Sequence, residues 1–167
     1  GNLIADAMLQ GVNAEIAIAN GGGIRAKKIY APGTMITRRD IQTELPFGNV
    51  VVKLGLKGSQ IWEALENGVS QVEQNAGRFP QVSGMSFTWN PKAEVGSRVV
   101  SVDIGGRPLN KSKTYTVATN DYLANGGDGY SVFKKGKVII DASGATYLAD
   151  MVMNYIEAKG TVSSKVE

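Results

Sequence analysis

The chain has 167 residues, of which 43% are apolar and 20% are charged, and it contains neither cysteine nor histidine. It can therefore form no Ser-His-Asp triad and no Cys-His pair, and no zinc site with the usual ligands. The net charge of +3 is small and spread along the chain, so we expect no nucleic-acid partner. No apolar run approaches the roughly 20 residues of a membrane span, and no signal peptide is present.

The length is that of one ordinary domain, with enough apolar residues for a core. The chain begins at Gly1, directly in an amphipathic stretch and without an initiator methionine. We interpret it as a piece of a longer protein, which leaves room for a signal sequence further upstream.

Helical and alternating apolar patterns follow one another irregularly, with no internal repeat and no linker. They predict one α/β (α+β) domain with a mixed β-sheet covered by helices. Thr37 is expected to cap a helix with Asp40 at its third position, and Pro46 to end it. The expected helices cover Asn2–Gln10, Arg38–Glu44, the stretch around Ile61–Val69, and Leu148–Ile156 with Gly160 as its stop. The expected strands cover Glu15–Ala19, Asn49–Leu56, Met85–Trp89, Arg98–Ile104, Thr114–Thr119 and Lys137–Asp141. Core positions are expected at Trp62, Phe87, Trp89, Tyr147, Met151 and Tyr155.

Two glycine-containing loops beside predicted strands combine backbone freedom with a recognition side chain. In Asn20–Arg25 (NGGGIR), glycines expose backbone N–H groups and Arg25 offers a planar fork for phosphate or sugar oxygens. In Leu45–Asn49 (LPFGN), Phe47 can present its ring to a planar ligand. Taken alone, the first is more typical of a tight turn with a surface arginine. The second, alone, is more typical of a phenylalanine that closes the core.

The third loop is Asn120–Tyr130 (NDYLANGGDGY), and its composition exceeds what a simple connection needs. Tyr122 offers a second stacking face, and Asp128 among its glycines can accept hydrogen bonds from a vicinal diol. The alternative is an Asx-type turn with an exposed tyrosine. Together the three loops hold the set that a nucleoside requires: two rings for the base, a carboxylate for the ribose and a cation toward the phosphate.

The strings NGGGIR, LPFGN and NDYLANGGDGY, in this order and at these separations, closely resemble the C-terminal domain of the 5′-nucleotidase family. The resemblance extends over nearly the whole chain. It implies a two-domain hydrolase in which an upstream metallophosphoesterase domain, joined in cis, carries two divalent metals such as zinc or manganese. This chain then supplies no catalytic residue and no metal ligand, and is expected to be inactive alone. The resemblance also implies a periplasmic or extracellular location.

The resemblance further implies roles for individual residues. Phe47 and Tyr122 are expected to sandwich the base, with a tyrosine where family members often carry phenylalanine. Asp128 is the expected acceptor for the ribose hydroxyls, and Arg25 is expected to reach the ribose or the phosphate. The remaining expected contacts to base or sugar are Asn20, Gly48 and Asn49.

Several other functions stay open at this stage. A relative could act as a UDP-sugar or NAD pyrophosphatase, a 2′,3′-cyclic nucleotide phosphodiesterase or a thiosulfohydrolase, although the last would not need two base-stacking rings. A nucleoside-binding module without catalysis is an alternative from another class. A purely structural domain is the fourth, and it predicts that removing Phe47, Tyr122 or Asp128 leaves ligand binding unchanged.

Overall fold

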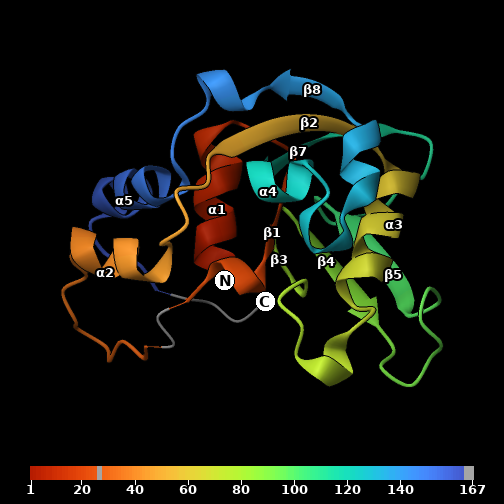
Figure 1. Ribbon diagram of the computed structural model, residues 1–167, viewed down its shortest axis with the longest axis horizontal. Helices are drawn as coiled ribbons and strands as arrows, with labels where there is room; N and C mark the ends of the chain where they lie inside the picture. The colour runs from red at the N-terminus through yellow and green to blue at the C-terminus, as the bar shows by residue number, and fades with distance from the viewer. Residues whose placement is uncertain (26–27, 164–167) are drawn as a thin grey trace.

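The computed structural model describes residues 1–25 and 28–163 and places them in one α/β domain (Figure 1). Five strands form a mixed sheet in the order β3-β1-β7-β2-β8, and three form a small antiparallel sheet in the order β4-β5-β6. The predicted fold class is therefore confirmed. The helices are α1 (Asn2–Gly11), α2 (Arg38–Glu44), α3 (Gly58–Gly68), α4 (Asp121–Ala124) and α5 (Leu148–Lys159). The strands are β1 (Ile16–Asn20), β2 (Val51–Lys57), β3 (Pro80–Ser83), β4 (Met85–Trp89), β5 (Val99–Ile104), β6 (Arg107–Pro108), β7 (Thr114–Asn120) and β8 (Lys137–Ile140). No helix among the described residues is long and apolar enough to cross a membrane.

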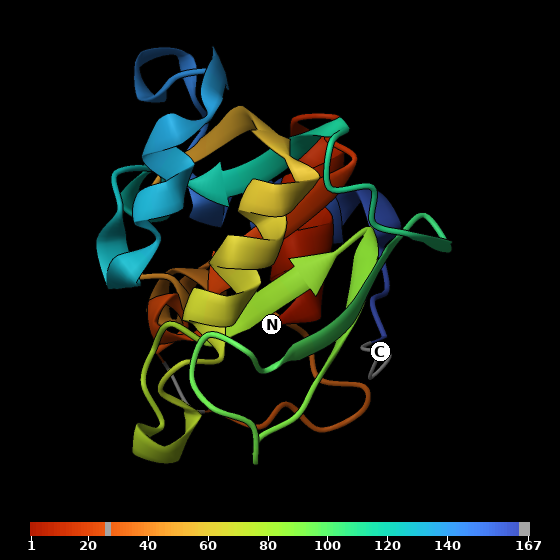
Figure 2. The same ribbon diagram turned by 90° about the vertical axis from the view of Figure 1, so that its right-hand side faces the viewer.

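The large sheet lies between two apolar cores because alternate residues of its central strands point to opposite faces. In β1, Ile16 and Ile18 join the core under α3, whereas Ala17 and Ala19 join the core under α1 and α5. The small alanine side chains let α1 approach the sheet closely. Figure 2 shows α3 in front of the sheet and α1 behind it. All five residues of β1 are buried, as a strand covered on both faces requires.

Local signals account for most element ends. Thr37 and Asp40 form the expected reciprocal capping box, and α2 ends at Glu44, before Pro46. Gly160 follows the last helix with a positive φ of 69°. The turn between β5 and β6 has both of its central glycines at positive φ, as a tight hairpin needs.

Some expectations were incomplete or wrong. The strands β3 and β6 and the short helix α4 were not predicted. β3 is an edge strand that pairs antiparallel with β1. Tyr147 was expected in the core, but 58% of its surface is exposed. It lies just before the first residue of α5, so it does not share that helix's apolar face. Trp62, Phe87, Trp89 and Tyr155 are partly buried against the two cores, and Met151 is buried.

Glu66 on α3 fastens the small sheet to the helix, which gives a stability prediction. Its carboxylate accepts hydrogen bonds from the backbone N–H groups of Arg98 and Val99, both at 2.9 Å. Glu66→Ala leaves both donors without this acceptor, so we expect it to lower the free energy of unfolding by about 2 kcal/mol. Urea denaturation measures the change.

The control lies on the same helix. The exposed carboxylate of Glu63 is 3.8 Å from the ammonium of Lys135. Such a surface pair contributes little, so Glu63→Ala should change stability by less than about 0.5 kcal/mol. Equal effects of the two substitutions would contradict the role given to Glu66.

Candidate functional site

The three glycine-containing loops meet at one edge of the large sheet, and the strand directions explain why. Strands β1 and β7 are parallel neighbours, so the segments that follow Asn20 and Asn120 leave the sheet at the same edge. Strand β2 runs antiparallel to β7 with Val51 opposite Asn120, so the segment that precedes β2 reaches this edge as well. The carboxyl ends of parallel strands are where open α/β sheets bind ligands.

Two asparagines join the first and third loops. The side-chain amide of Asn120 donates a hydrogen bond to the Asn20 side-chain oxygen at 3.1 Å, and both residues are buried. The Asn120 oxygen in turn accepts from the backbone N–H of Leu123 at 2.8 Å and caps α4. The start of α4, which carries Tyr122, is therefore fixed to the end of β1.

The Asp128 carboxylate is held from two sides. Its Oδ2 accepts a hydrogen bond from the Asn20 side-chain amide at 2.7 Å, and its Oδ1 accepts one from the Tyr122 hydroxyl at 2.9 Å. The hydrogen bond to Asp128 raises the pKa of the Tyr122 phenol above its ordinary value. Asp128 has a positive φ of 51° between Gly126 and Gly129, at 85° and 82°. A non-glycine residue in this region is uncommon and often marks a functional site.

Phe47 and Arg25 form the second recognition unit. The Arg25 guanidinium lies 5.5 Å from the centroid of the Phe47 ring, within the range of a cation–π contact. Its Nη1 also donates to the carbonyl of Gly22 at 3.4 Å. Phe47 is 58% exposed and Tyr122 is 47% exposed, so both rings can contact a ligand.

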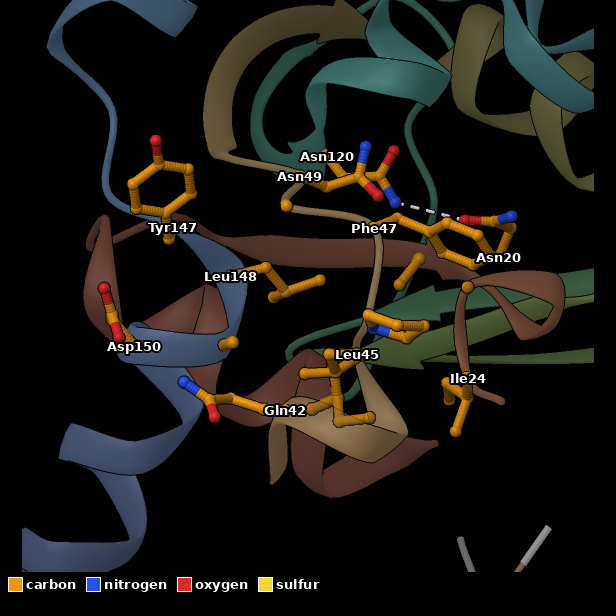
Figure 3. Close-up of a pocket in the computed structure, with 16 residues that line it drawn as sticks. Asn20, Ile24, Gln42, Leu45, Phe47, Asn49, Asn120, Tyr147, Leu148 and Asp150 are labelled. Carbon is orange, nitrogen blue, oxygen red and sulfur yellow. Dashed lines mark hydrogen bonds between the residues drawn. The ribbon is translucent and has the colours of Figure 1, made fainter. Parts of the chain in front are cut away.

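A cavity of about 370 Å³ opens beside Phe47 (Figure 3). Apolar side chains, side-chain amides and one carboxylate line it. The cavity is formed by residues of α1, the ends of β1 and β7 with the segment that follows β1, α2 with the loop that follows it, and the start of α5. The lining residues are Ile4, Ala19, Asn20, Gly23, Ile24, Gln42, Leu45, Pro46, Phe47, Gly48, Asn49, Asn120, Tyr147, Leu148, Ala149 and Asp150.

The predicted site residues divide between this cavity and the loop next to it. The cavity is lined by four of them, namely Asn20, Phe47, Gly48 and Asn49. Arg25 does not line the cavity but contacts Phe47 from the first loop. Tyr122 and Asp128 lie outside it and connect to it through Asn20, which borders the cavity and donates to Asp128.

Asn49 has a partner that its expected role did not include. Its side-chain amide donates to Asp121 Oδ1 at 2.8 Å, and the same oxygen accepts from the backbone N–H of Val50 at 3.2 Å. Asp121 is the first residue of α4. The loop before β2 is thereby hydrogen-bonded to the segment that carries Tyr122, so Asn49 helps to hold the two loops together. A contact of Asn49 with a ligand stays a prediction.

Sequence reasoning missed several residues that support the site. Asn120 stood in the third motif but was not named as a site residue. Asn67 donates to the backbone carbonyl of Asp128 at 3.1 Å and accepts from Arg78 Nη1 at 3.3 Å. These two contacts join residues that lie 61 and 11 positions apart in the sequence, so no local pattern indicates them. Asn120 could have been identified as a site residue from its place at the end of a predicted strand.

Across residues 1–25 and 28–163, no group of three or more Asp or Glu side chains is arranged to hold a metal ion. The carboxylate of Asp150 lines the cavity. The carboxylates of Asp121 and Asp128, in the third loop, accept hydrogen bonds from amide, hydroxyl or backbone donors.

Comparison with known proteins places this arrangement in a family. Residues 1–135 match the family model described as "5'-nucleotidase, C-terminal domain". The chain belongs to this family. It is 45% identical over 142 residues to the trifunctional nucleotide phosphoesterase YfkN of Bacillus subtilis, covering 80% of this chain and 10% of that protein. It is 35% identical over 185 residues to a 5′-nucleotidase of Diplobatis ommata, covering all of this chain and 32% of that protein.

The fold of the 5′-nucleotidase C-terminal domain is also seen in solved structures. The 5′-nucleotidase precursor of Thermus thermophilus is 41% identical and superposes with a TM-score of 0.90. The match covers 99% of this chain and 33% of that one. The chain thus spans a third or less of the length of these relatives.

Proposed function

We propose that this chain binds the nucleoside part of a nucleotide within a hydrolase that releases phosphate from nucleotides. One observation carries the proposal: three loops far apart in sequence meet at one sheet edge. There they bring together two exposed aromatic rings, an arginine and the carboxylate of Asp128, whose backbone has a left-handed conformation. Membership of the 5′-nucleotidase C-terminal domain family supports it, since the relatives are hydrolases of this kind by name.

In this proposal the base stacks between the rings of Phe47 and Tyr122. Both are exposed, and each lies on a loop that hydrogen bonds tie to the sheet edge. Stacking of a base on an aromatic side chain contributes roughly 1–3 kcal/mol per contact. Because every base has a π-face, such a site accepts several bases, so we expect broad nucleotide specificity.

Asp128 accepts hydrogen bonds from the ribose diol, and Arg25 reaches toward the sugar or the phosphate. The 2.7 Å hydrogen bond from Asn20 fixes the orientation of the carboxylate. Arg25 lies next to the Phe47 ring, so a cation is available beside the expected position of the base. An arginine fork suits bidentate contact with phosphate oxygens.

The chemistry of phosphate release belongs, in this proposal, to a metallophosphoesterase domain joined in cis before Gly1. The described residues of this chain do not form a cluster that fits a metal ion, so we assign them no step in metal chemistry. Two divalent metals in the other domain would activate the attacking water. This chain binds the nucleoside and orients the phosphate, which lowers the entropic barrier of the reaction. A location outside the cytoplasm is part of the same proposal.

The test is nucleotide binding to the chain, measured by isothermal titration calorimetry with AMP, UMP, UDP-glucose and NAD. We expect binding of at least one of them, and Phe47→Ala should weaken it about 30-fold, from a stacking loss of about 2 kcal/mol. Val95→Ala is the control, because Val95 is 62% exposed on a loop that does not line the cavity. Unchanged affinity in Phe47→Ala would rule out the stacking site. Absence of binding across the panel would rule out the proposed function.

A further inference from the structure

The Tyr122 hydroxyl makes two contacts with one residue. It donates to Asp128 Oδ1 at 2.9 Å and accepts from the backbone N–H of Asp128 at 3.2 Å. A phenylalanine at this position could make neither contact. The hydroxyl therefore ties the ring to the carboxylate that the proposed function assigns to the ribose.

The loop is shaped to receive the tyrosine ring. A Cβ at Gly127 would lie 2.5 Å from carbons of the Tyr122 ring, so the ring lies directly against the glycine backbone. The loop also places Asp128 at a φ of 51°, which turns its backbone N–H and its carboxylate toward the same hydroxyl. The Tyr122 side chain is consequently held both by packing against Gly127 and by its hydrogen bonds with Asp128.

A vicinal diol and this hydroxyl need the same acceptor. Two ribose hydroxyls bind a carboxylate by donating to its two oxygens. Asp128 Oδ2 already accepts from the amide of Asn20 at 2.7 Å, and Oδ1 accepts from Tyr122. Each carboxylate oxygen has two lone pairs, so the Asn20 hydrogen bond can persist beside one ribose hydroxyl. On Oδ1 the Tyr122 hydroxyl is already a donor, and it is held there because its ring packs against Gly127.

We propose that the Tyr122 hydroxyl competes with the ribose diol for Asp128, and so sets how strongly this site distinguishes ribonucleosides from nucleosides that lack the diol. The inference rests on the proposed function. Binding a ribonucleoside breaks the hydrogen bond between Tyr122 and Asp128, and binding a nucleoside without the diol does not. The tyrosine therefore lowers the affinity gained from the diol, while its ring keeps its stacking surface.

The experiment compares adenosine with 2′,3′-dideoxyadenosine on the wild-type chain and on Tyr122→Phe by isothermal titration calorimetry. Tyr122→Phe keeps the ring and removes the competing donor. We expect its Kd for adenosine to fall about threefold to tenfold, as the loss of one net hydrogen bond implies. The Kd for the dideoxynucleoside should stay within about twofold of the wild-type value. Tyr155→Phe, on α5, is the matched control and should change neither.

The opposite result has a clear meaning. If Tyr122→Phe weakens adenosine binding or leaves it unchanged, the hydroxyl does not compete with the ligand, which overturns the inference; weaker binding would show that it orients Asp128 for the ligand. Asp128→Asn separates this failure from failure of the proposed function. If Asp128→Asn weakens adenosine binding while Tyr122→Phe does not tighten it, the nucleoside site stands and only the competition is rejected. If wild type binds neither nucleoside, both proposals fail.

Discussion

Asp128→Ala is expected to weaken the binding of adenosine to this chain about 100-fold. The carboxylate accepts charge-assisted hydrogen bonds, each of which contributes about 1.5–3 kcal/mol. Losing the acceptor for a diol therefore amounts to about 3 kcal/mol, because binding the diol to wild type also gives up the hydrogen bond from Tyr122. Calorimetric titration measures the affinity, and thermal unfolding shows whether the variant remains folded.

Asp128→Asn is the control for backbone strain in this experiment. Residue 128 has a φ of 51°, a conformation that asparagine tolerates and alanine does not. Asparagine keeps one acceptor oxygen and loses the charge, so its affinity should lie between those of wild type and Asp128→Ala. If all three proteins bind adenosine equally, Asp128 does not contact the ribose, and the assignment of the site to a nucleoside loses its main polar contact.

The elements that the sequence predicted well are those with a regular spacing of apolar residues or with clear signals at their ends. In β1, the alternating, small and apolar stretch Glu15–Ala19, which runs directly into Asn20, indicated a buried strand, and all five residues of the strand are buried. In α2, Thr37 and Asp40 indicated the start and Pro46 the end. β3 escaped prediction because its four residues begin at a proline, and it exists through pairing with the distant strand β1.

The site was only partly predictable because it also depends on pairing between strands that are distant in the sequence. The three motifs indicated the residue types, but their convergence depends on the parallel pairing of β1 with β7 and the antiparallel pairing of β7 with β2. The hydrogen bond between Asn20 and Asp128 joins residues 108 positions apart. The Tyr122 hydroxyl contact is local, yet it follows from the positive φ values of the Gly126–Gly129 turn, which composition indicates only in general terms.

Tyr130→Ala is expected to lower the free energy of unfolding by about 4 kcal/mol, the usual cost of removing a large buried ring. Tyr130 is fully buried, directly after the Asp128 loop, and its ring packs against Phe133 with centroids 5.2 Å apart. Its hydroxyl donates to the backbone carbonyl of Arg78 at 2.7 Å. Burial raises the pKa of this phenol well above its ordinary value.

This substitution also tests whether the core positions the site. The Tyr130 ring packs in the core at one end of the loop that carries Asp128. Its hydroxyl donates a hydrogen bond to the backbone of Arg78, whose side chain in turn donates to Asn67. Tyr130→Phe keeps the ring and removes only the hydrogen bond, so urea denaturation should show a loss of about 1 kcal/mol. If core packing positions Asp128, Tyr130→Ala weakens adenosine binding under conditions in which it remains folded, whereas Tyr130→Phe leaves affinity within about twofold. If folded Tyr130→Ala binds adenosine with full affinity, the hydrogen bonds from Asn120 to Asn20 and from Asn20 to Asp128 hold the Asp128 loop without the Tyr130 ring.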